Sequence, residues 1–225
     1  MAKRKNILSV TVIAILIALG LSFVKIFTWP FGTSVTLLSM VPLLVIGYKY
    51  GVKWGLFSGL MFGVVKGLLD ALVFNTMSGF TATQFAVVFV ADYVVANFVL
   101  GFSGLFRDRI NSDSAAITLG GAFAVILNYA AHFVSRFIIY GGEAHKYFDE
   151  MTNSFKGSFL EGTSIANMLT TLSENVIAHH TGNYRGEIYS FIYTSTYMIP
   201  ELVLTLVCVL ILMAIPRVNY FISNE

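Results

Sequence analysis

Long apolar runs, several of them with 18 or more residues, recur along the whole chain and are separated by short polar or Gly/Pro-marked turns. A helical run of that length crosses a hydrocarbon core about 30 Å thick, and a helix satisfies its own backbone hydrogen bonds where no water is present. The runs therefore predict an all-α integral membrane protein. We expect one membrane domain (1–225) with six transmembrane helices at about 7–28, 35–50, 52–74, 82–106, 115–140 and 188–215, and a long segment, 141–187, between the last two.

The composition agrees with a membrane protein. Hydrophobic residues make up 56% of the 225 residues, charged residues 12%, and the mean hydropathy is +0.77, whereas a soluble domain carries about 25% charged residues. A net charge of +2 with dispersed basic residues excludes a nucleic-acid partner. The single cysteine, Cys208, lies in an apolar run and allows no intrachain disulfide. The spacing of His145, His179 and His180 fits no metal-site pattern, so we expect no metal and no cofactor.

Three basic residues, Lys3, Arg4 and Lys5, precede the first apolar run, as they do in a signal peptide. No small-residue cleavage site follows, and further membrane segments come directly after this run. We therefore expect a retained first helix.

The basic residues are distributed unevenly between the two ends of the predicted helices. The side of the N-terminus carries Lys3, Arg4, Lys5, Lys49, Lys53, Arg107, Arg109 and Arg217. The other side has two short connections without Lys or Arg, 29–34 and 75–81, and the long segment, in which acidic residues outnumber basic ones. By the positive-inside rule we expect a multi-pass protein of the plasma membrane with both termini in the cytoplasm and 141–187 outside.

Ionisable residues inside the predicted helices are candidates for a functional site, because a charge in hydrocarbon costs about 2.5–3.5 kcal/mol on insertion scales. These residues are Lys66, Asp70, Asp92, His132, Arg136 and Glu201. With a rise of about 1.5 Å per residue, Glu201 lies near the middle of its helix and the others lie in the outer half of theirs.

Two predicted helices also carry polar residues at four-residue spacing, which places them on one helix face. The fifth helix carries Asn128, His132, Arg136 and Tyr140; the sixth carries Tyr189, Tyr193, Tyr197 and Glu201, with Ser190 and Thr194 beside them. Polar faces from four helices would converge on a cavity that is open to the outside and closed below. Such a shape is typical of a capture site rather than of a continuous pore.

Simpler explanations exist for single residues. Lys66 and Asp70 are four residues apart on one helix and can neutralise each other. Tyr189 can belong to the aromatic belt at the membrane interface. A membrane histidine such as His132 is usually a hydrogen-bonded packing residue, although Arg136 and Asp92 at a similar depth favour a site.

Four stretches, in this order, resemble the thiamine-specific substrate-binding subunit of energy-coupling factor transporters. They are GTSVTLLSMVP (32–42) with YGVKWG (50–55), Asp92-Tyr93 leading to LGFSGLFR (100–107), AHFVS (131–135), and YSFIYT (189–194) with YMIPE (197–201). The resemblance implies a six-helix subunit without catalytic activity or cofactor. It also implies thiamine as the ligand, and a membrane coupling subunit and a pair of cytoplasmic ATPases as partners.

The resemblance assigns residues as well. By position, the ligand would contact Asp92, Tyr93, His132, Tyr140, Tyr189 and Thr194. Ala14 and Ala18 have the small-residue spacing with which the family's first helix packs on the coupling subunit. Thiamine carries a permanent positive charge, so a carboxylate such as Asp92 and aromatic faces suit it. Arg136, Tyr193 and Glu201 are expected to extend the pocket.

The chain departs from the family at four places. It has Thr194 where Asn is usual, Val94 where Pro is usual, and Arg136 where a small residue is usual, and its 141–187 segment is longer. An extra cation beside a cationic ligand is unfavourable unless a carboxylate (Asp70, Asp92 or Glu201) neutralises it. A related vitamin or a pyrimidine precursor therefore stays open as the ligand.

Two other functions need consideration. Gly101-Phe102-Ser103-Gly104 has the form found in intramembrane rhomboid proteases, but a nucleophilic serine needs a base within hydrogen-bond reach. The sixth helix has no histidine, and Ser103 is expected at the cytoplasmic end, far from His132. A structural or assembly subunit without a ligand would be favoured if side chains filled the outer cavity.

The segment 141–187 is expected to form a lid over the cavity, because it joins the two helices that carry the polar stripes. Apolar residues at near-helical spacing predict an amphipathic helix around 155–173.

Overall fold

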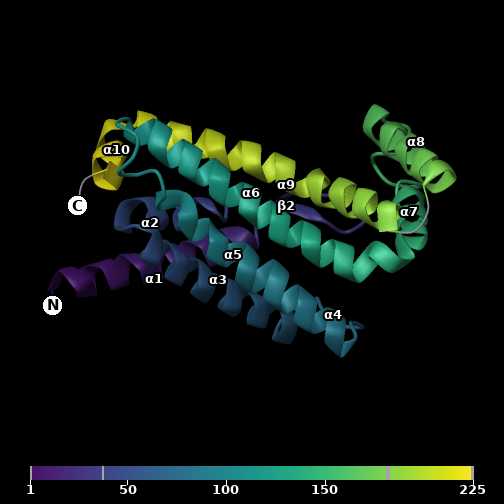
Figure 1. Cartoon of the computed structure of the whole chain (residues 1–225), viewed down its shortest axis with the longest axis horizontal. Helices are drawn as coiled ribbons and strands as arrows, with labels where there is room; N and C mark the ends of the chain where they lie inside the picture. The colour runs from purple at the N-terminus through teal and green to yellow at the C-terminus, as the bar shows by residue number, and fades with distance from the viewer. Residues whose placement is uncertain (1, 37, 181–182, 224–225) are drawn as a thin grey trace.

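The computed structural model describes residues 2–36, 38–180 and 183–223. The elements are α1 (Ala2–Ser22), β1 (Lys25–Thr28), β2 (Ser34–Thr36), α2 (Val41–Tyr50), α3 (Val52–Leu72), α4 (Ala82–Val87), η1 (Val88–Val95), α5 (Ala96–Phe98), η2 (Val99–Gly104), α6 (Asp113–Tyr140), η3 (Gly141–Glu143), α7 (Ala144–Asn153), α8 (Ser164–His179), α9 (Asn183–Ala214) and α10 (Pro216–Ser223). The long helices run side by side along the molecule's longest axis (Figure 1).

Four of the described helical segments are long and apolar enough to cross a membrane: Val52–Leu72, Ala82–Gly104, Asp113–Asn153 and Tyr184–Ala214. Two shorter apolar helices, Asn6–Ser22 and Val41–Tyr50, accompany them. These six segments correspond in order to the six helices predicted from the sequence.

The first predicted helix, 7–28, ended too late, and the second, 35–50, began too early, because α1 ends at Ser22 and α2 begins at Val41. Between α1 and α2 the chain forms an antiparallel two-stranded hairpin in which Lys25 pairs with Thr36 and Thr28 with Ser34. Gly32, with a φ of +94°, supports the reversal between the strands. Pro42, expected inside a longer helix, instead lies in the first turn of α2, where the missing N–H of proline removes no helical hydrogen bond.

The fourth span is not a regular α-helix. Val88–Val95 is π-helical and Val99–Gly104 is 3₁₀-helical, and such segments are frequent at functional sites. Glycines let the neighbouring helices approach this span closely. A Cβ atom at Gly63 of α3 would lie 2.1 Å from the Tyr93 carbonyl oxygen, and one at Gly120 of α6 would lie 2.0 Å from that of Ser103.

The long segment 141–187 is helical, but its helices do not match the one predicted. α7 ends at Asn153 and α8 begins at Ser164, so only the second half of the predicted helix at 155–173 is helical. Gly157 and Gly162 have φ values of +73° and +75°, which lie outside the right-handed helical region. The Oγ1 atom of Thr163 then accepts a hydrogen bond from the Ala166 amide and caps α8.

The apolar face assigned to that helix divides accordingly. Phe155 and Leu169 are buried, whereas Phe159 and Met168 are exposed. The buried residues of α7 and α8 pack with Trp29 and Phe31 of the hairpin and with α9 in a second core, separate from the main one; its buried members are Ala144, Phe148, Met151, Phe155, Ala166, Leu169, Val176, Tyr189 and Ile192.

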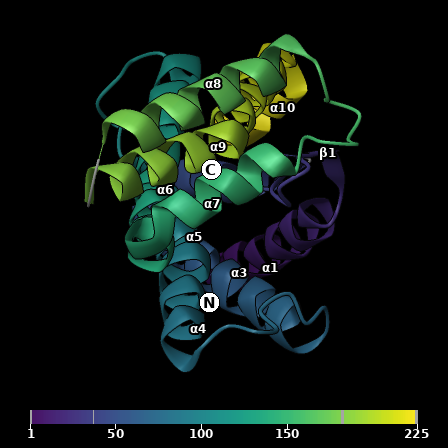
Figure 2. The same ribbon diagram turned by 90° about the vertical axis from the view of Figure 1, so that its right-hand side faces the viewer.

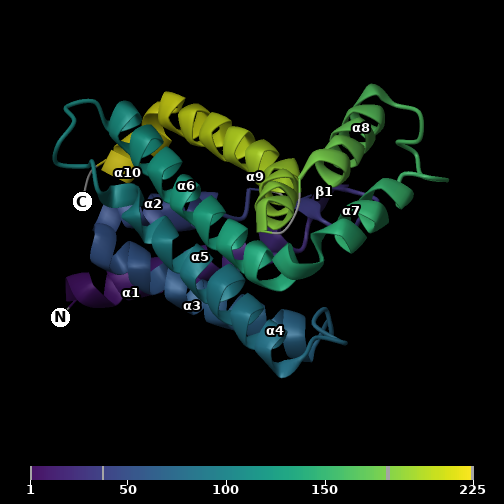
Figure 3. The same ribbon diagram turned by 45° about the vertical axis from the view of Figure 1, so that its right-hand side comes forward.

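The two ends of the bundle therefore differ. Both chain termini lie at one end, and α7 and α8 lie at the other (Figure 1). Seen from that second end, α7 and α8 cross in front of α6 and α9, whereas α4 lies below them (Figure 2). An intermediate view shows α7 and α8, which together we call the cap, projecting beyond the hairpin (Figure 3).

Candidate ligand-binding site

A cavity of about 430 Å³ lies between the hairpin, α3, η1, α6 and α9. Its walls are formed by Ser22, Lys25, Gly32, Thr33, Ser34, Thr36, Ser39, Met40, Phe62, Lys66, Asp70, Thr76, Met77, Phe80, Val88, Asp92, Tyr93, Asn97, Asn128, His132, Arg136, Tyr140, Tyr193, Tyr197, Met198 and Glu201. Every ionisable residue that the sequence analysis placed inside the predicted helices lies in this wall.

The four-residue spacing of the polar stripes explains this convergence. All four stripe residues of α6, from Asn128 to Tyr140, line the cavity. On α9 the stripe enters the wall at Tyr193 and continues through Tyr197 to Glu201. α6 and α9 are neighbours along the bundle, as Figure 1 shows, so each helix turns one polar face toward the same space.

Asp92 is the centre of a buried charged group. One oxygen, Oδ1, lies 3.1 Å from Nδ1 of His132, and the other, Oδ2, lies 2.9 Å from Nη1 of Arg136. The Arg136 guanidinium also lies 5.9 Å from the Tyr140 ring centroid and 5.7 Å from that of Tyr193, within the range of cation–π attraction. The unusual Arg136 is therefore neutralised by Asp92 and held between two tyrosines.

A second charged group lies in the wall formed by α3. Lys66 forms an ion pair with Asp70, one helical turn away, and the Tyr93 hydroxyl donates a hydrogen bond of 2.8 Å to the same carboxylate oxygen. The structure therefore shows Lys66 and Asp70 neutralising each other, which was the simpler explanation for these two residues. Tyr93 is thereby fixed between Asp70 and the cavity.

Glu201 joins the hairpin to α9. Its Oε1 accepts hydrogen bonds from the amide and the hydroxyl of Thr36, at 2.7 and 2.8 Å. Five residues earlier in α9, the indole of Trp29 donates a hydrogen bond to the Thr196 carbonyl at 3.1 Å. That carbonyl lacks the usual helical partner because residue 200, four positions on, is a proline without an N–H.

Two of the six predicted ligand residues, Tyr189 and Thr194, are not in the cavity wall. Thr194 is fully buried, and Tyr189 is 3% exposed. The Tyr189 ring packs at 5.9 Å from Tyr140 and 5.0 Å from Phe148. Tyr189 therefore supports the cavity residue Tyr140 from behind, in the core formed with α7.

Ala14 and Ala18, which the resemblance assigned to the contact with the coupling subunit, are packed inside the chain. Ala18 is fully buried and Ala14 is 9% exposed, and α1 packs on α2 and α3. Small residues permit close helix contacts within a chain as well as between chains, so sequence spacing did not distinguish the two. The exposed apolar side chains of α1 are instead Leu8, Val12, Ile13, Leu16 and Ile17.

The hairpin and Ser39, which follows it, also line the cavity, a contribution that was not predicted from the sequence. Lys25, Ser34, Thr36 and Ser39 line the cavity, but they lay in or beside segments expected to be helical. The alternation of polar Ser34 and Thr36 around buried Val35 is the period of a strand and could have indicated this role.

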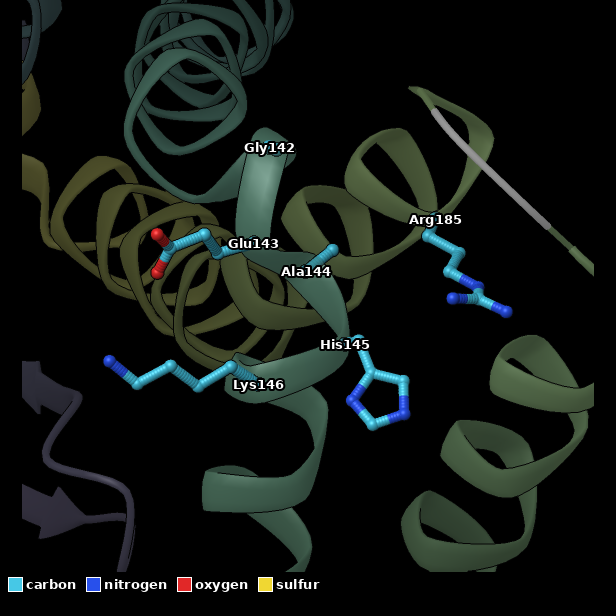
Figure 4. Close-up of a pocket in the computed structure, with 7 residues that line it drawn as sticks. Gly142, Glu143, Ala144, His145, Lys146 and Arg185 are labelled. Atoms are coloured by element: carbon cyan, nitrogen blue, oxygen red, sulfur yellow. The ribbon is translucent and has the colours of Figure 1, made fainter.

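A second hollow of about 630 Å³ lies at the start of α7, lined by Gly141, Gly142, Glu143, Ala144, His145, Lys146 and Arg185. Its charged side chains point in different directions rather than toward one common point (Figure 4). It is therefore a weaker candidate for a ligand site than the cavity within the bundle.

The protease-like serine has a structural role. Ser103 is fully buried, and its hydroxyl donates a hydrogen bond of 2.8 Å to the Leu44 carbonyl. His132 belongs to the cavity instead and contacts Asp92.

Residues 8–173 match the family described as Thiamine transporter protein (Thia_YuaJ). The chain belongs to this family. It is 27% identical over 198 residues to the thiamine transporter ThiT of Bacillus subtilis (strain 168), which covers 84% of this chain and 79% of that protein. A solved structure of ThiT from Listeria monocytogenes has the same fold, with a TM-score of 0.60 at 19% identity over 96% of this chain and 98% of that one.

The family membership confirms the resemblance noted in the sequence. Apart from its short hairpin the chain is helical; it is a multi-pass membrane protein of the thiamine transporter family, and it is not an enzyme. The cavity is therefore the place where the ligand of such a transporter is expected.

Proposed function

We propose that this chain captures thiamine in the cavity between the hairpin, α3, η1, α6 and α9. In this proposal the chain is the substrate-binding subunit of an ATP-driven vitamin uptake transporter. The observation that carries it is the convergence of the two polar stripes on one cavity of about 430 Å³ in a member of the thiamine transporter family. Ligand pockets typically measure about 300–1,000 Å³, so a two-ring vitamin fits this volume.

The wall chemistry suits a ligand with one cationic and one neutral aromatic ring. Tyr140, Tyr193 and Tyr197 line the cavity and offer faces for stacking and for cation–π attraction. Asn128 and Asn97 add amide groups that can hydrogen-bond to an aminopyrimidine. The cavity also has carboxylates for the positive charge.

The direct test is titration of the detergent-purified protein with thiamine, followed by quenching of protein fluorescence. We expect saturable, tight binding, and native mass spectrometry should detect the same ligand bound to protein purified from cells. Arg136, which departs from the family pattern and lines the cavity, keeps a related vitamin or a pyrimidine precursor as the second candidate. Preferential binding of the isolated aminopyrimidine over thiamine in competition would favour that candidate and contradict ours.

The partners in this proposal are a membrane coupling subunit and ATPase subunits on the cytoplasmic side. The exposed apolar face of α1 around Val12 and Leu16 is the surface that we assign to the coupling subunit, in place of Ala14 and Ala18. Lipid covers the remaining apolar surface of the bundle.

We predict that both termini are cytoplasmic and that α7 is outside the cell. Support comes from two basic residues. Lys49 donates a hydrogen bond to the Phe221 carbonyl of α10, and Arg107 donates one to the Lys49 carbonyl. Both therefore lie near α10, at the end that holds both termini (Figure 1), as the positive-inside rule requires of a cytoplasmic end. In a variant with Cys208 replaced by serine, a cysteine at exposed position Glu150 should react with an impermeant maleimide in intact cells. A cysteine at exposed Arg109 should react only after permeabilisation. The reverse pattern would overturn the orientation.

We further propose that α7 and α8 form a lid. Their buried residues join one aromatic core with Trp29 and Phe31 of the hairpin, and Tyr140 and Tyr193 pack against that core. The same two tyrosines line the cavity, so the cap and the cavity share a wall.

Replacing 145–183 with a short Gly/Ser linker tests the lid. The linker can be short because Gly186 packs directly on Gly141; a Cβ atom on Gly186 would lie 2.6 Å from the Gly141 Cα atom. We expect thiamine to dissociate faster by about tenfold or more, because closure commits the ligand, and stopped-flow fluorescence measures this rate. An unchanged dissociation rate in a well-folded deletion variant would reject the lid.

A further inference from the structure

Three carboxylates line the cavity, and two of them already have cationic partners. Asp92 contacts Arg136 and His132, and Asp70 pairs with Lys66. Within the described part of the chain, Glu201 is in no ion pair. The cavity therefore contains one carboxylate that is in no described ion pair.

Burial makes a charge on Glu201 without an ion-pair partner costly. Glu201 is 9% exposed, and burial of a carboxylate without a cation is unfavourable unless hydrogen bonds or a counter-charge compensate. Both described hydrogen bonds to Glu201 come from Thr36 and use Oε1. They orient the carboxylate but supply no full positive charge.

We propose that Glu201 is the counter-charge for the positively charged ring of the ligand. This inference rests on the proposed function and names the carboxylate that recognises the cation. Asp92 suited that role when only the sequence was considered, but in the structure its charge is shared by Arg136 and His132. The ligand's cation completes an ion pair at Glu201 that the protein leaves open.

The surroundings of Glu201 fit a cationic ring. Tyr197 lies one turn away on the same face of α9 and, like Met198 and Met40, lines the cavity. An aromatic face and polarisable thioethers accommodate a sulfur-containing cationic ring. With the cationic ring at Glu201, the neutral ring would stack on Tyr140. Tyr140 is the last residue of α6, so the neutral ring would occupy the part of the cavity nearer to α7 and the cationic ring the part farther from it.

The test compares thiamine with 3-deazathiamine, a neutral isostere in which carbon replaces the charged ring nitrogen. Glu201→Gln keeps an oxygen acceptor for Thr36 and removes only the charge. We expect this variant to bind thiamine about 30-fold or more weakly, as for the loss of one member of a buried charge pair, and to bind the neutral isostere within about threefold of the wild type. The matched control, Glu187→Gln on exposed α9 surface, should leave both affinities unchanged.

Two further variants separate the charge of Glu201 from its hydrogen bond and test the inference if Glu201→Gln does not fold. Thr36→Val removes one hydrogen bond and keeps the charge, so it should weaken thiamine binding only a few-fold. Ser39→Lys keeps Glu201 and adds a cation beside it, because Ser39 contacts Thr36 at 3.0 Å; it should weaken thiamine and spare the isostere even if Glu201→Gln does not fold. Equal loss of both ligands, or unchanged thiamine affinity, in a folded Glu201→Gln protein would overturn the inference while the proposed function stands. A wild-type protein that binds no thiamine would overturn both.

Discussion

Replacing Asp92 with asparagine is expected to weaken thiamine binding at least tenfold, equivalent to about 1.4 kcal/mol. The change leaves Arg136, whose side chain is 16% exposed, without its carboxylate at 2.9 Å. An unpaired buried charge costs about 3–5 kcal/mol, and the freed cation would also repel a cationic ligand. Isothermal titration measures the affinity, and thermal unfolding in detergent measures the stability.

A double-variant cycle identifies the cause of that loss. Asp92→Asn combined with Arg136→Met removes both charges, so we expect the double variant to be more stable than Asp92→Asn alone. Unlike Glu201→Gln, the Asp92→Asn variant should lose affinity for the neutral isostere as well, because it disturbs the cavity wall itself. Normal thiamine affinity in a folded Asp92→Asn protein would contradict a role for this residue in the site.

Replacing Gly120 with alanine is expected to destabilise the bundle strongly. A Cβ atom at this position would lie 2.0 Å from the Ser103 carbonyl oxygen, a backbone atom that cannot move without displacing η2 from α6. Overpacking of this kind costs about 1–3 kcal/mol and sometimes more. The variant should unfold at a lower temperature or fail to accumulate in the membrane.

Gly20→Ala is the matched control for this prediction. Gly20 lies in α1, and a Cβ atom there would meet nothing within 4 Å. Because alanine has a higher helix propensity than glycine, by up to about 1 kcal/mol, this variant should be as stable as the wild type or slightly more stable. Equal stability of Gly120→Ala and Gly20→Ala would mean that α6 and η2 do not pack as closely as described.

Much of the candidate site followed from the spacing of polar residues. A four-residue period places Asn128, His132, Arg136 and Tyr140 on one helix face whatever the helix packs against. The high cost of a charge in hydrocarbon then requires that face to turn toward a polar interior. The structure places all four residues in one cavity wall, as those two rules require.

Other parts of the site depended on contacts that sequence periodicity does not contain. Nothing local indicates that Asp92 pairs with Arg136, which is 44 positions later. Likewise, Thr36 binds Glu201 at a separation of 165 positions. These pairings depend on which helices become neighbours, and the close approaches at glycines such as Gly63 and Gly120 decide that.

The sequence by itself therefore determined the class of protein, the order of its apolar helices and the helix faces that bear the site, because length, hydropathy and helical period act locally. Only the tertiary structure decided where α1 ends and the hairpin begins, which carboxylates are already neutralised, and that Tyr189 lies behind the cavity rather than in its wall. The physical reason is that charge compensation and burial arise between segments distant in the chain. Glu201 differs from Asp92 in its neighbours, and those neighbours are brought to it by folding.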